Sequence, residues 1–224
     1  MPEPISPPTP LVHRAVRTGG ILLAIAAAQF VAVMIVVQQH YAGYSLTGNY
    51  ISDLGGVHSP WALLYDASVI LLGAIVVPAL LLIWSSFDAH PARSPGLVLL
   101  ILGACGAIAV GVFPETTHVL GGRAHDIATF VTFIGAAVGL VVLSFAMRRP
   151  DRWRFSGRYT LVSGAVSAVA IVLFALGYDL TLGVGGMERL VVAPLLLWMV
   201  VEGAHIGLLH RFAPGLATPH VASI

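Results

Sequence analysis

Long apolar stretches alternate with short polar segments along the whole chain, and this alternation predicts six membrane-spanning helices. Each stretch approaches the ~20 residues that an α-helix needs to cross ~30 Å of hydrocarbon. The fold class that follows is all-α, a polytopic bundle of six transmembrane helices. The expected spans are residues 19–37, 60–84, 96–113, 127–147, 159–178 and 189–209.

Polar segments at both ends of the chain predict three parts. A transmembrane domain is expected over residues 19–210, between an N-terminal tail, 1–18, and a C-terminal tail, 211–224. The first ten residues hold five prolines, which disfavour helix and packing, so we expect the N-terminal tail to be disordered. The first apolar stretch is longer than the core of a signal peptide and lacks a small-x-small cleavage site, which indicates an uncleaved span.

Composition excludes a water-soluble domain. Hydrophobic residues make up 58% of the 224 and charged residues only 9%, against roughly 25% charged residues in ordinary soluble domains. The expected partner is therefore the lipid bilayer. A net charge of +1 argues against a nucleic-acid partner, because such proteins carry a basic excess. Cys105 is the only cysteine, so no intrachain disulfide can form.

The basic residues predict the orientation of the chain. All eleven are arginines, and cytoplasmic segments of membrane proteins are enriched in arginine and lysine. If both termini are cytoplasmic, nine arginines lie inside and two outside, so we expect both tails in the cytoplasm and the protein in the cell membrane. The inner set is Arg14, Arg17, Arg93, Arg148, Arg149, Arg152, Arg154, Arg158 and Arg211; the outer set is Arg123 and Arg189.

Most of the residues with potential chemistry then fall at the outer face. Asp66 is the most unusual of them, because it lies about 9 Å into the second span, where an unpaired carboxylate is costly. We expect Arg123 or Arg189 to neutralise it, either as part of a functional pocket or as an ion pair that only fixes helix packing. The candidate polar site comprises Asn49, Ser52, Asp53, Asp66, Glu115, His118, Arg123, His125, Asp126 and Arg189.

The sequence does not decide which chemistry this candidate site supports. His118, His125 and Asp126 are candidate metal ligands, but no HExxH or CxxC pattern supports a metal. A nucleophilic arrangement of Ser52 with a histidine and an aspartate is possible by residue type, without the G-x-S-x-G turn that positions such a serine. Catalytic residues and cofactors are therefore not assigned.

Small residues at four-residue spacing predict close helix packing. Gly103, Ala107 and Gly111 share one face of the third span, and Gly135 and Gly139 share one face of the fourth. Such stripes let two backbones approach closely in a membrane. The alternative is that glycine is simply frequent in membrane helices.

Short motifs at the helix ends resemble a known family. The stretch from Asn49 to Gly55, the segment from Val112 to Glu115 and the histidine His125 are similar in order and placement to the bacterial and archaeal membrane proteins grouped as domain of unknown function 998. The resemblance covers residues 44–143. It implies a compact six-helix membrane protein and carries no activity or catalytic residue.

Three functional hypotheses follow from these observations. The first is a non-enzymatic accessory or lipid-binding component, which would hold a lipid or another membrane protein. The second is a hydrolase or transferase acting on lipid at the outer leaflet, with a cleft that contains His118, His125 and a carboxylate. The third is a small transporter, with a continuous polar track through the bundle.

Overall fold

Six long helices account for most of the chain. The computed structural model describes residues 10–87, 89–147 and 154–208, and within these ranges it contains helices and no strand. All six long helices are apolar and long enough to cross a membrane, which confirms the all-α, six-helix prediction. They are α1 (Pro10–His40), α2 (Ala62–Ile83), α3 (Arg93–Val112), α4 (Ala124–Met147), α5 (Arg154–Ala175) and α6 (Gly183–Leu208), with short 3₁₀ helices η1 (Ser52–Gly55), η2 (Trp84–Ser86) and η3 (Val119–Gly122).

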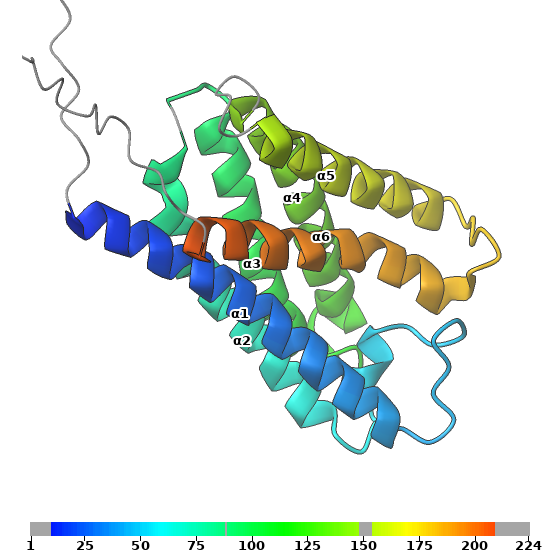
Figure 1. The fold of residues 1–224 in the computed structure, drawn as a ribbon. Helices are drawn as coiled ribbons and strands as arrows, with labels where there is room; N and C mark the ends of the chain where they lie inside the picture. The colour runs from blue at the N-terminus through cyan, green and yellow to red at the C-terminus, as the bar shows by residue number, and fades with distance from the viewer. Residues whose placement is uncertain (1–9, 88, 148–153, 209–224) are drawn as a thin grey trace, which may run out of the picture.

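The helices form a closed ring. Each helix packs against its neighbours in the chain, and α6 returns to pack against α1 (Figure 1). The chain reverses direction between successive helices, so the connections 41–61, 113–123 and 176–182 lie at one end of the bundle. We call this the polar end. The start of α1 and the end of α6 lie at the opposite end.

Five of the six helices begin earlier than the apolar pattern predicts, and α1 and α6 differ from it most. α1 begins at Pro10, so residues 10–18, expected in the disordered tail, are helical. Proline suits the first turn of a helix because its missing N–H has no partner there. α6 begins at Gly183, six residues before the expected start, which moves Glu188 and Arg189 from a loop into a helix. Residues 1–9 and the C-terminal tail, 211–224, lie outside the described part of the chain.

Glycines allow the helices of the ring to approach closely. A Cβ on Gly135 would lie 2.9 Å from the backbone nitrogen of Gly103, which confirms the expected contact between α3 and α4. A Cβ on Gly139 would lie 2.9 Å from the Leu100 side chain in the same interface. Gly111 differs from the prediction, because it faces Ile70 of α2 rather than α4. The stripe on α3 therefore serves two interfaces.

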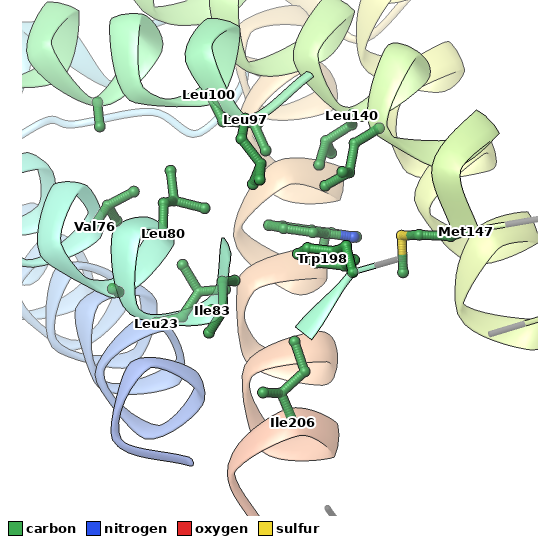
Figure 2. Close-up of a cluster of buried hydrophobic side chains, with 14 of the residues drawn as sticks. Leu23, Val76, Leu80, Ile83, Leu97, Leu100, Leu140, Met147, Trp198 and Ile206 are labelled. Atoms are coloured by element: carbon green, nitrogen blue, oxygen red, sulfur yellow. The ribbon is translucent and has the colours of Figure 1, made fainter. Parts of the chain in front are cut away.

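A tryptophan lies in the hydrophobic core toward the end opposite the polar end. Trp198 projects from α6 between the side chains of α2, α3 and α4, as Figure 2 shows. Its indole N–H donates a 2.8 Å hydrogen bond to the Thr160 hydroxyl, so its polar atom is satisfied within the core. The surrounding residues include Leu80, Ile83, Leu97, Leu100, Leu140 and Met147.

Candidate functional site

Arg189 anchors the first connection of the polar end to α6. Its guanidinium donates hydrogen bonds to the carbonyls of Leu46 at 2.9 Å, Asn49 at 3.2 Å and Gly185 at 2.8 Å. Its other terminal nitrogen donates to the Tyr44 hydroxyl at 2.7 Å. Several acceptors around one planar donor group match the fork geometry of arginine. The charge of Arg189 is therefore directed at loop backbone and not at a carboxylate.

Tyr44 continues this network. Its hydroxyl donates to the carbonyl of Tyr50 at 2.8 Å while it accepts from Arg189. Burial raises the pKa of the Tyr44 hydroxyl above its ordinary value of 10.0, although Arg189 opposes the shift. The hydroxyl therefore keeps its proton and remains a donor at neutral pH.

Backbone amides and an asparagine hold the carboxylates of Asp53 in the first connection and of Glu188 in α6. The Asp53 carboxylate accepts hydrogen bonds from the Asn49 side-chain amide at 2.8 Å and from the Tyr50 backbone N–H at 3.0 Å. The Glu188 carboxylate, only 6% exposed, accepts from the backbone N–H of Ile51. The connection is thus held against α6 by both members of the Glu188–Arg189 pair.

A glycine-rich helix start makes room for this contact. A Cβ on Gly185 would overlap the carbonyl oxygen of Asn49, and one on Gly183 would overlap that of Thr47. The backbone of the first connection therefore lies directly on the first turn of α6. Gly185 also donates its backbone N–H to the Thr47 carbonyl at 3.0 Å.

A pocket of about 480 Å³ opens beneath the first connection, where α4, α5 and α6 meet. We call it the outer pocket. One part of its lining is polar, with Ser52, Glu115, His125, Asp126 and Glu188. The other part is apolar and comes from α4 and α5: Phe130, Phe133, Ile134, Ile171, Phe174 and Ala175. Polar and apolar walls of this kind fit an amphiphilic molecule.

His125 is the best-positioned chemical group in the outer pocket. It is 7% exposed, and its Nδ1 lies 2.9 Å from the carbonyl oxygen of Phe113. A carbonyl only accepts, so Nδ1 carries the proton and Nε2 of the neutral ring is left as an acceptor. The ring is therefore held in one orientation by this hydrogen bond.

Glu115 forms a carboxyl pair with Asp53 at the rim of the pocket. Glu115 remains exposed, yet partial burial raises the pKa of its carboxyl above the ordinary 4.5. The negative charge of Asp53 and a hydrogen bond between the two side chains raise the pKa further, while His125 opposes the shift. The Glu115 carboxyl therefore binds a proton more readily than an ordinary glutamate does.

A second cavity, of about 130 Å³, lies inside the helix ring. We call it the central cavity. Its lining is almost entirely apolar and extends from Ile51 at the polar end to Leu80, Leu140 and Trp198. The residues that line both cavities are Ser52, Thr129, Phe133 and Glu188.

Thr129 has an unused hydroxyl between the two cavities. Its Oγ1 is buried and has no hydrogen-bond partner within the described residues. The neighbouring Thr132 donates its hydroxyl to the carbonyl of Ala128 at 2.8 Å, one turn back on the same helix. An unsatisfied buried hydroxyl costs about 1–3 kcal/mol, so its position points to a missing partner.

The candidate polar site is brought together in part. Ser52, Glu115, His125 and Asp126 line the outer pocket, and Asn49, Asp53 and Arg189 hold its roof. His118 and Arg123 are exposed and line neither cavity. The structure therefore brings only part of the candidate polar site together in one pocket.

Asp66 has no arginine partner, contrary to expectation. It is partly buried, and a Cβ on Gly55 would overlap its Oδ1. Among residues 10–87, 89–147 and 154–208, no ion pair joins Asp66 to Arg123 or Arg189. The guanidinium of Arg189 is instead occupied by the backbone carbonyls of the first connection.

The expected metal ligands are not assembled. Within the described parts of the chain, no three histidine, cysteine, aspartate or glutamate side chains form a group that could hold a metal ion. His118 lies outside the outer pocket, while His125 and Asp126 both line it. The geometry therefore gives the metal hypothesis no support.

Sequence reasoning did not include Glu188, Tyr44 and Thr129 in the candidate site. Glu188 carries a signal, because it is an acidic residue directly before Arg189, which belongs to the outer arginine set. Tyr44 and Thr129 carried none, since a tyrosine and a threonine are ordinary residues near the ends of membrane helices. Their roles depend on contacts between segments distant in sequence.

Comparison with known proteins gives one match, to a family model. The model described as "Protein of unknown function (DUF998)" matches residues 24–205, which is most of the chain. No curated protein and no solved structure matches the sequence. The match includes α2, α3, α4 and α5 entirely, the second half of α1 and most of α6, so it covers the ring and both cavities. The chain therefore belongs to the DUF998 family of proteins.

Proposed function

We propose that this protein is a non-enzymatic membrane component that binds a lipid in the outer pocket. The single observation that carries the proposal is the composition of that pocket, where carboxylates and a buried histidine face six apolar side chains from α4 and α5. A lipid offers the same division between a polar head and an apolar chain. Because both helices are of membrane-spanning length, their apolar walls would open toward the acyl chains of the bilayer.

We also propose that the polar end faces the outside of the cell membrane. The nine-to-two distribution of arginines supports both termini in the cytoplasm. With this orientation the outer pocket lies at the level of the outer-leaflet headgroups, so an outer-leaflet lipid would enter sideways between α4 and α5.

The test is lipid occupancy in a variant whose pocket is filled. Ala175→Trp places a large ring in the outer pocket, and Val172→Trp places the same ring on an exposed position of the same helix. Both proteins would be purified in mild detergent, mixed with a total membrane lipid extract and measured by native mass spectrometry. We expect bound lipid in the wild type and in Val172→Trp, with at least a tenfold loss in Ala175→Trp. Equal occupancy in both variants would overturn the proposal.

A membrane hydrolase or transferase is the second candidate, and one observation favours it. His125 presents a basic Nε2 inside the outer pocket, beside Glu115 whose raised pKa suits a proton donor. His125→Asn preserves a donor for the Phe113 carbonyl and removes Nε2. Lipid turnover by the wild type, detected by mass spectrometry and lost in His125→Asn, would replace the binding proposal with this one.

A transporter finds less support in the geometry. The central cavity is apolar and ends near Trp198, and neither cavity is lined by the buried Glu202 of α6. Within the described residues, the two cavities therefore supply no continuous polar track across the bundle.

A further inference from the structure

We infer that the ligand is a single-chain amphiphile whose head donates hydrogen bonds, an amine or an alcohol, and whose chain end occupies the central cavity. This inference rests on the proposed lipid-binding function. It adds the chemical class of the head and the path of the chain.

The polar wall of the outer pocket consists mainly of acceptors. Glu115, Asp126 and Glu188 contribute carboxyl groups, and His125 contributes Nε2, which is an acceptor in the neutral ring because Nδ1 donates to the Phe113 carbonyl. No arginine of the described residues lines the pocket, and Arg189, which follows the lining residue Glu188, is occupied by backbone carbonyls and Tyr44. A donor head is complementary to this wall, whereas a phosphate or carboxylate head would meet like charge.

The residues shared by the two cavities define a path for the chain. Ser52 and Glu188 border both cavities from the roof and α6, and Thr129 and Phe133 border both from α4. The buried, unpartnered hydroxyl of Thr129 lies at this junction and can donate to a polar atom close to the head. Beyond the junction the lining is apolar, as the remainder of an alkyl chain requires.

The size of the central cavity limits what can enter it. Its volume of about 130 Å³ is close to that of the ~150 Å³ apolar cavity that accommodates benzene in an engineered protein. It therefore fits the last few carbons of one chain and not the two chains of a common phospholipid. The rest of the chain would follow the apolar wall of the outer pocket.

Trp198 provides a direct probe of the chain end, because it lines the central cavity and is only 2% exposed. Replacement of Trp61, Trp84 and Trp153 by phenylalanine leaves Trp198 as the only tryptophan. This protein, in nanodiscs, would be titrated with alkyl amines, alcohols and carboxylates of equal length that carry bromine on the terminal carbon. Bromine quenches tryptophan fluorescence at short range.

We expect the amine and the alcohol to quench Trp198 at concentrations at least tenfold below the carboxylate. Isomers with bromine beside the head should not quench. Ala104→Leu, which fills part of the central cavity, should abolish quenching by the terminal bromine; Ala107→Leu is a second such variant.

Failure of this inference is distinguishable from failure of the proposed function. If the probes raise the melting temperature without quenching Trp198, the chain stays in the outer pocket and the inference is overturned while lipid binding stands. Equal quenching by the carboxylate would overturn the donor-head assignment. If no probe changes the melting temperature or the fluorescence, the inference is overturned, whereas the proposed function is overturned only by equal lipid occupancy in Ala175→Trp and Val172→Trp.

Discussion

Replacement of Arg189 by methionine tests how the roof of the outer pocket is held. Arg189→Met removes four hydrogen bonds, three to backbone carbonyls and one to the Tyr44 hydroxyl. Methionine retains much of the apolar stem of arginine, so the loss is confined mainly to the polar contacts. We expect the connection 41–56 to detach from α6 while the six helices stay packed.

The loss in the free energy of unfolding caused by Arg189→Met follows from the environment of each hydrogen bond that it removes. The bond to the Leu46 carbonyl is exposed, so water replaces it at little cost. The bonds to Asn49, Gly185 and Tyr44 are partly buried, and each contributes about 1 kcal/mol to the free energy of unfolding. The total loss is about 3 kcal/mol, which lowers the melting temperature by roughly 6 to 12 °C in a chain of this length.

Thermal unfolding in detergent measures this loss, with Arg123→Met as the matched control. Arg123 lies at the same end of the bundle and is exposed, without a hydrogen bond from its side chain among the described residues. The control removes the same charge and should shift the melting temperature by no more than about 1 °C. Equal melting temperatures for the two variants would refute the role assigned to Arg189.

Hydrogen exchange adds a readout that global destabilisation alone does not produce. In Arg189→Met, amides of residues 41–56 should lose protection while those in the middle of α3 and α4 keep it. Uniform loss of protection over all helices would mean that Arg189 acts on the bundle as a whole, contrary to the geometry.

Three further predictions concern packing, pH and orientation. Gly135→Leu should destabilise the protein by more than about 2 kcal/mol because its side chain meets the α3 backbone, whereas the exposed Val138→Leu should not; equal melting temperatures would contradict this. Because the Glu115 pKa is raised in the folded state, the folded protein binds more protons above pH 4.5, so stability should fall as pH rises from 4.5 through the raised pKa. Glu115→Gln should remove the fall in stability with pH that Glu115 causes. An unchanged dependence of stability on pH in this variant would exclude that role of Glu115. In a cysteine-free background, an impermeant maleimide should label Thr116→Cys but not Ala89→Cys in intact cells, and the reverse pattern would invert the orientation.

The six helices were predictable because their signal is local. Each span is an uninterrupted apolar stretch, and no contact with another segment is needed to recognise it. Helix starts were less predictable, because they depend on partners. The first turn of α6 contains Gly183, Gly185 and Gly186, which favour helix poorly, and it packs against backbone of the first connection. The apolar pattern therefore placed the start of that span at Arg189.

The sequence predicted which residues could belong to the candidate site only from their type and from the loop or helix end in which they lie. Ser52, Glu115, His125 and Asp126 share a pocket because every second loop of an up-and-down bundle returns to one end. The partner of each charge was not predictable. Electrostatics alone assigned an arginine to Asp66, but Arg189 donates instead to two carbonyls of the first connection, to the Gly185 carbonyl of its own helix and to the Tyr44 hydroxyl.

The location of the outer pocket follows from where small and large residues alternate along α5. Toward the end opposite the polar end, Gly157 and Gly164 bring the α5 backbone against α4, and a Cβ on Gly164 would lie 2.8 Å from the carbonyl of Ala137. Toward the polar end the facing residues are bulky, with Phe130 on α4 and Phe174 on α5, so the helices diverge there (Figure 1). The two helices are closely packed at one end and leave an opening at the other, and that opening is lined by aromatic rings beside the only histidine buried in the described bundle, His125. A ring of helices held together by glycine contacts can thus keep an entrance at one interface without weakening the remaining five.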